Sequence, residues 1–172
     1  MKAVEKKMSS VIKDFIGCLE KDPDNDLYYT ESDMKCLLYL LIRKEFSREL
    51  KSRKYCLLTE YLITKLPGMS NAYGAYEHPR IDVVLLNSGR DRIVYGIELK
   101  NGYSSPKKGE DVFTKDVKRI KDLNRRGKVD YGTCLWYDIC HNNCKEIEKK
   151  VNGMGTKRIK CIYIHTPGKE GE

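Results

Sequence analysis

The order of helical and strand-like segments along the chain predicts an α/β protein. Two segments near the N-terminus carry apolar residues at helical spacing, and three strand-like segments follow them. A helix, a strand, a short helix and a last strand complete the series, so the expected order is α, α, β, β, β, α, β, α, β. The chain has 172 residues and contains no internal repeat, linker or low-complexity segment, which predicts one domain with a sizeable core.

Two amphipathic helices are expected at the start of the chain. The first covers residues 4–21, and the polar segment 22–26, Asp-Pro-Asp-Asn-Asp, ends it. Thr30 is the expected N-cap of the second helix. The apolar side of that second helix consists of Met34, Leu37, Leu38, Leu41, Ile42 and Phe46. A strand over 55–63 and a loop over 67–79 come next.

A hairpin is expected after this loop. Its strands cover residues 80–86 and 92–100, and the segment Asn-Ser-Gly-Arg-Asp makes the turn between them. Beyond the hairpin we expect a loop over 101–109, a helix over 111–126, a strand over 133–140, a helix over 144–151 and a strand over 158–165. Gly127 is a plausible end of the first of these helices.

The hairpin brings three side chains with metal-site chemistry together. Side chains alternate between the two faces of a strand, so Glu98 and Lys100 share one face. Asp82, in the other strand of the hairpin, is expected beside that pair. Two carboxylates and one ammonium at the ends of apolar strands suit a hard divalent cation and a water molecule beside it.

These residues resemble the motif of the PD-(D/E)xK nuclease superfamily. In that motif an Asp in one strand is followed, after a turn, by Glu-x-Lys at the end of the next apolar strand. The matching segments here are Arg-Ile-Asp at 80–82 and Gly-Ile-Glu-Leu-Lys at 96–100. Ile81 stands where the motif usually has proline, a departure that leaves the acid of Asp82 in place. The resemblance covers residues 29–167.

The resemblance implies both a fold and a site. The fold would be restriction-endonuclease-like, with an αβββαβ core, a mixed central sheet flanked by helices and an extra N-terminal helix. The chain would then be a single nuclease-like domain over 1–172, with 1–28 as its helical extension. Asp82 and Glu98 would bind Mg²⁺ or Mn²⁺. Lys100 would orient or deprotonate the attacking water and offset charge on the phosphate.

A further acid is expected near the metal, and three residues compete for this role. Glu31 lies at the start of the second apolar stripe, and the family often carries a Glu on the helix before the three strands. The alternative is that Glu31 only complements the helix dipole. Glu45 falls near the apolar side of the same helix, and Glu60 lies within the first strand.

The charge of the chain favours a polyanionic partner. The formal net charge is +8 and the pI is near 9.0. Lys118, Lys121 and Arg125 are spaced three and four residues apart on one side of the predicted 111–126 helix. We expect them to contact nucleic-acid phosphates, and the alternative for each is a solvated helix face.

The cysteines indicate a reducing compartment rather than a disulfide framework. There are seven, several lie inside apolar runs, and no secretory signal precedes them, so we expect buried thiols and an intracellular, cytoplasmic protein. Cys36, Cys56, Cys134 and Cys161 are the residues expected to be buried. Zinc bound at 140–144 is not favoured, because no second Cys/His pair accompanies that segment. No apolar run approaches the ~20 residues that a membrane span requires.

Taken together, the sequence predicts a metal-dependent nuclease that hydrolyses phosphodiester bonds in DNA. One alternative is a nucleic-acid-binding module on the same fold with little or no catalysis, and a second is a nuclease that acts on RNA. A homodimer would be consistent with a duplex substrate, which has two strands to cut.

Overall fold

The fold is built on a five-stranded mixed sheet. The computed structural model describes residues 2–20, 30–69, 79–101, 106–138 and 144–165. The strands are β1 (Tyr55–Leu62), β2 (Arg80–Asn87), β3 (Ile93–Asn101), β4 (Val129–Asp138) and β5 (Ile159–His165). They lie side by side in chain order; β1, β2 and β3 are antiparallel neighbours, whereas β3, β4 and β5 are parallel.

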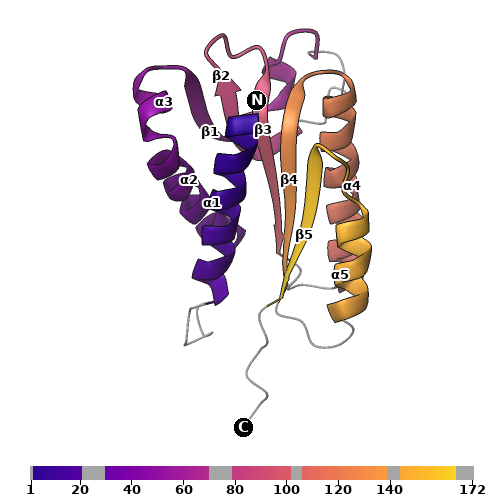
Figure 1. Ribbon diagram of the computed structural model, residues 1–172. Helices are drawn as coiled ribbons and strands as arrows, with labels where there is room; N and C mark the ends of the chain where they lie inside the picture. The colour runs from indigo at the N-terminus through magenta and orange to yellow at the C-terminus, as the bar shows by residue number, and fades with distance from the viewer. Residues whose placement is uncertain (1, 21–29, 70–78, 102–105, 139–143, 166–172) are drawn as a thin grey trace.

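Helices cover both faces of this sheet. They are α1 (Lys2–Glu20), α2 (Glu31–Glu45), α3 (Ser47–Lys51), α4 (Pro106–Arg125) and α5 (Cys144–Gly153). Helices α1 and α2 pack on one face, and α4 and α5 pack on the other (Figure 1). Each face has its own apolar core, so the sheet is buried on both sides, as expected for an α/β protein.

Local sequence signals set the boundaries of the helices that carry the site. The Thr30 hydroxyl accepts a hydrogen bond from the Asp33 N–H at 3.2 Å, and the Asp33 carboxylate accepts one from the Thr30 N–H at 2.9 Å, which makes a capping box at the start of α2. Gly127 has a φ of 68° directly after α4, a conformation that glycine adopts at little cost. Both residues were predicted to be helix boundaries, and both predictions are confirmed.

The predicted order of elements is confirmed, with corrections at four places. Helix α4 begins at Pro106, inside the segment predicted as a loop over 101–109, since proline suits the first position of a helix. Strand β4 begins at Val129 rather than 133. The short helix α3 and a 3₁₀ turn at Ile63–Lys65 were not predicted, because both are too brief to show a periodic pattern.

The prediction for the cysteines is confirmed only in part. The six cysteines in the described ranges are free thiols. Cys134 and Cys161 are buried as expected, and Cys56 is partly buried. Cys36 is exposed, contrary to the prediction, because it lies off the face of α2 that Met34 and Leu38 bury. The candidate zinc segment 140–144 falls mostly outside the described residues. No helix among the described residues has the length and apolarity to cross a membrane.

Candidate active site

The candidate site lies where β2 and β3 part. Their antiparallel ladder ends at the pair Val83–Ile97. Beyond that pair β2 remains paired with β1, and β3 remains paired with β4. The divergence leaves a fork between the two strands, with Asp82 on one arm and Glu98 and Lys100 on the other. The three motif residues therefore lie close together, as we predicted from the hairpin.

Asp82 ties the two arms of the fork together. Its Oδ2 accepts a hydrogen bond from the backbone N–H of Leu99 at 2.7 Å. In an unbroken ladder a backbone carbonyl would accept this bond, so the carboxylate takes the place of the missing partner. Asp82 is only 7% exposed. Burial raises the pKa of its carboxyl, while the Leu99 N–H and the Lys100 ammonium act against that increase.

Glu98 is the most buried acid of the site, at 2% exposure. Helix α4 supplies its partner: Arg119 Nη2 lies 2.7 Å from Glu98 Oε1, and Arg119 Nε lies 3.2 Å from the same oxygen. The same guanidinium is 2.7 Å from Oδ1 of Asp116, a second buried acid of α4. Burial raises the pKa of Glu98 well above its usual value, although Arg119 favours the ionised form.

Lys100 is held between two acids from different elements. Its Nζ lies 3.5 Å from Glu31 Oε2 on α2 and 3.5 Å from Asp116 Oδ2 on α4. Burial favours the neutral amine, but the surrounding carboxylates, with Asp116 and Glu31 foremost, outweigh it and raise the pKa of Lys100. Lys100 is therefore an ammonium at the fork.

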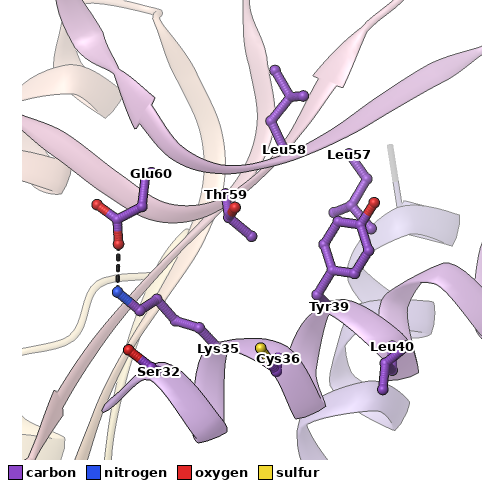
Figure 2. Close-up of a pocket in the computed structure, with 9 residues that line it drawn as sticks. All are labelled: Ser32, Lys35, Cys36, Tyr39, Leu40, Leu57, Leu58, Thr59 and Glu60. Atoms are coloured by element: carbon purple, nitrogen blue, oxygen red, sulfur yellow. Dashed lines mark hydrogen bonds and ion pairs between the residues drawn. The ribbon is translucent and has the colours of Figure 1, made fainter.

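A second lysine, Lys35 of α2, connects the fork to the edge strand β1. Lys35 Nζ lies 3.8 Å from Glu31 Oε1 and 3.8 Å from Asp82 Oδ1, and it also binds the Glu60 carboxylate. Figure 2 shows the Lys35 side chain reaching from the helix to Glu60, at one end of a groove of about 710 Å³ between α2 and β1. Glu60 has a φ of 50°, a left-handed conformation that is uncommon for residues other than glycine.

The structure separates the three acids that competed for the additional role. Glu31 lies at the fork through Lys100 and Lys35. Glu60 lies at its rim through Lys35 and Arg80. Glu45 does not belong to the site, because it lies at the far end of α2, 3.9 Å from Lys7 of α1.

The structure does not bring Lys118, Lys121 or Arg125 into the fork. Among the described contacts none joins these three residues to the motif residues, and Lys118 and Arg125 are exposed. Their predicted contact with phosphates stays a prediction. The α4 residues that do reach the fork are Asp116 and Arg119.

Sequence reasoning missed Asp116, Arg119 and Lys35. The sequence nevertheless contains a pattern that indicates the position of each of them. Asp116 and Arg119 lie next to the apolar stripe of α4 that contains Phe113 and Ile120, so both face the sheet. Lys35 follows Glu31 by four residues on α2, which places the two side chains on the same side of the helix.

The residues of the fork fit a divalent cation in charge and in donor type. Five carboxylates contribute, namely Glu31, Glu60, Asp82, Glu98 and Asp116. Four cations accompany them, namely Lys35, Arg80, Lys100 and Arg119. As formal charges these leave −1, so the fork carries an excess of negative charge that suits a cation. The buried Oδ2 of Asp116 receives no hydrogen bond from the described residues and has the Lys100 ammonium 3.5 Å away as an ion-pair partner.

The number of ligands that the protein itself would supply is small. Within the described ranges, no three His, Cys, Asp or Glu side chains are arranged to hold a metal ion. Asp82 and Glu98 remain the predicted protein carboxylates, and water, backbone carbonyls and substrate oxygens would be the further ligands. This pattern suits Mg²⁺, which usually takes one or two carboxylates and keeps several waters.

Comparison of the chain with protein-family models, with curated proteins and with solved structures found no match.

Proposed function

We propose that this protein is a metal-dependent nuclease of the PD-(D/E)xK type that hydrolyses phosphodiester bonds in DNA. The observation that carries the proposal is the convergence of Asp82, Glu98 and Lys100 at the fork where β2 and β3 part. Two carboxylates and an ammonium meet there without any contribution from a distant part of the chain. A domain that only binds nucleic acid has no need of this combination.

The metal would be Mg²⁺ or Mn²⁺, held by Asp82 and Glu98. When bound, it would supply a water activated for attack and a charge that offsets the negative phosphate. Lys100 orients the attacking water and stabilises the charge that develops on the phosphate oxygens. Its Nζ is in place for this, because acids on two helices fix it from both sides.

Glu31 and Asp116 act through Lys100 and are therefore positioning residues. Each lies 3.5 Å from Lys100 Nζ, one on α2 and the other on α4. Arg119 has a related role for Glu98, because it fixes the carboxylate from which it is 2.7 Å away. A positioned side chain loses less conformational freedom when substrate arrives, which lowers the barrier to reaction.

The arrangement of the sheet supports the restriction-endonuclease-like fold that we propose. A helix precedes three antiparallel strands, and a helix and a parallel strand follow them. This is the αβββαβ order of the proposed core. Helix α5 and strand β5 extend the sheet on one side, and α1 adds a second helix beside α2.

A second candidate is a nucleic-acid-binding module without catalysis. One observation favours it: in the metal-free chain every motif acid already has a partner, with Arg119 on Glu98 and Lys35 near Asp82. If these partners hold the acids permanently, no metal enters. The decisive difference between the two candidates is therefore metal binding at the fork.

The test combines metal binding with cleavage. Isothermal titration with Mn²⁺ should give about one site per chain for the wild type and none for Asp82→Asn. Plasmid, linear duplex, single-stranded DNA and RNA would be incubated with Mg²⁺, Mn²⁺ or EDTA. We expect cleavage of DNA with either metal and none with EDTA. Asp14→Asn is the control, since Asp14 is an exposed acid of α1 and no described ion pair or hydrogen bond joins it to the fork. Equal metal binding by wild type and Asp82→Asn would refute the assignment, and cleavage of RNA alone would change the substrate.

A further inference from the structure

A groove on the edge strand β1 shares Glu60 with the rim of the fork. Its volume is about 580 Å³, and β1 supplies most of its wall. Glu60 belongs to this wall and also to the site, since it binds Lys35. A molecule lying in the groove would therefore lie beside the acid that connects the rim of the fork to Lys35.

Three cations line this groove, namely Lys65, Arg80 and Arg90. Lys65 and Arg90 are exposed, and no carboxylate among the described residues pairs with either. Arg80 has a weak partner, because its Nη1 lies 3.9 Å from Glu60 Oε2 and its side chain is 54% exposed. The groove therefore carries an excess of positive charge that no contact within the described chain neutralises.

The backbone positions of these cations are fixed by the fold. Arg90 lies in the β2–β3 turn, where Asn87 Oδ1 accepts hydrogen bonds from the N–H groups of Asp91 and Arg92 at 3.2 Å each. Arg90 itself has a φ of 56°. A turn held in this way presents its side chain at a fixed point and loses little freedom when a ligand binds.

Lys65 and Arg80 are anchored at the opposite end of the groove. Lys65 ends the 3₁₀ turn Ile63–Lys65, in which Ile63 is fully buried. The N–H of Ile63 donates a hydrogen bond to the carbonyl of Pro79 at 3.1 Å, which joins this turn to the residue before Arg80. The groove thus has cations at both ends and Glu60 beside the fork.

The groove between α2 and β1, on the other side of Glu60, has a less basic wall. Figure 2 shows that Cys36, Tyr39 and Leu57 contribute much of its wall. Lys35 is a cation in that wall, and it already pairs with carboxylates. Among the described residues that line the two grooves, the cations without a close carboxylate partner are Lys65 and Arg90, and Arg80 beside them is only weakly paired.

We propose that the β1 groove binds the sugar–phosphate backbone of the nucleic-acid substrate on one side of the bond to be cut. Lys65, Arg80 and Arg90 would each contact a phosphate, while the scissile phosphate lies at the fork beyond Glu60. This inference rests on the proposed nuclease function for the position of the scissile phosphate at the fork. The binding itself depends only on the charge and shape of the groove.

Fluorescence anisotropy of a labelled DNA duplex in EDTA, across a series of salt concentrations, tests this inference without any cleavage. The variant is Lys65→Ala/Arg80→Ala/Arg90→Asn, with Asn chosen because it tolerates a positive φ. The control is Lys2→Ala/Lys6→Ala/Lys13→Ala, which removes three charges from exposed positions of α1. Losing three phosphate contacts should lower the slope of log K against log salt by about 2.7 and weaken binding by about ten- to a hundredfold.

The control should change the slope by less than about one. Equal losses in both variants, or no loss in the groove variant, would overturn the inference. Arg90→Asn alone is a second, milder variant and should lower the slope by about one. With Mg²⁺ present, the groove variant should raise KM by a larger factor than it lowers kcat.

These experiments test the proposed groove and the proposed nuclease function separately. Cleavage by the wild type together with normal binding by the groove variant would reject the groove alone. Binding through the groove without any metal-dependent cleavage would reject the nuclease function alone.

Discussion

Replacing Arg119 with Met should destabilise the metal-free protein strongly, because Arg119 is the partner of two buried acids. Glu98 is 2% exposed and Asp116 is 4% exposed, and the guanidinium lies 2.7 Å from each. Removing one partner of a buried ion pair leaves an uncompensated charge and costs about 3–5 kcal/mol. That is a large part of the ~5–15 kcal/mol that stabilises a typical domain.

Arg126→Met is a matched control for this substitution. Arg126 lies directly after α4 and is also 2.7 Å from its partner, Asp122, but the two side chains are 53% and 41% exposed. An exposed pair of this kind contributes about 0–1 kcal/mol. The two variants therefore differ in burial and in the number of acids paired, but not in the length of the ion pairs.

Urea denaturation in EDTA would measure both free energies of unfolding. Adding Glu98→Gln to Arg119→Met should recover about 1–3 kcal/mol, because the neutral amide no longer needs a counter-charge. Mg²⁺ should also stabilise Arg119→Met, by about 2.7 kcal/mol at a hundred times the dissociation constant. A cost for Arg119→Met no larger than that for Arg126→Met would refute the reasoning.

Two further predictions concern other parts of the molecule. Lys100→Ala should lose turnover but keep most of its DNA affinity, whereas Lys118→Ala should weaken DNA binding and lower the slope of log K against log salt by about one. Single-turnover cleavage and fluorescence anisotropy measure the two effects. Equal loss of affinity in both variants would contradict the separate roles of Lys100 and Lys118. Gly132→Ala should cost about 1–3 kcal/mol, since a Cβ there would lie 3.0 Å from a backbone oxygen. Gly17→Ala should stabilise α1 by up to ~1 kcal/mol, because nothing lies within 4 Å of the added Cβ. Thermal unfolding measures the Tm of both glycine variants, and equal shifts in Tm would contradict the packing argument.

The motif residues could be predicted from sequence because their placement depends on short-range rules. Alternation along a strand puts Glu98 and Lys100 on one face, and a five-residue turn, 87–91, makes the hairpin that brings Asp82 to them. The opening of the ladder at this point was not predicted. It depends on how β2 and β3 pair with their outer neighbours, which no local pattern in either strand records.

The contribution of α4 to the fork could not be predicted in the same way. Apolar spacing correctly identified the buried side of the helix, but not how closely it approaches the sheet. Ile120 Cδ1 lies 2.6 Å from where a Cβ of Gly132 would be and 3.3 Å from that of Gly96. These two glycines let the helix pack closely against the sheet that carries Glu98, and Arg119 then reaches that acid.

The central claim is that hydrolysis takes place at the fork and depends on a metal held by Asp82 and Glu98. The most direct measurement is the single-turnover rate of cleavage of a labelled DNA duplex as a function of Mg²⁺ concentration, for wild type, Asp82→Asn, Glu98→Gln and the control Asp14→Asn. We predict a saturable Mg²⁺ dependence for wild type and Asp14→Asn, no cleavage in EDTA, and no detectable cleavage by either site variant. Cleavage by Asp82→Asn or Glu98→Gln at the wild-type rate, or wild-type cleavage that persists in EDTA, would contradict the claim.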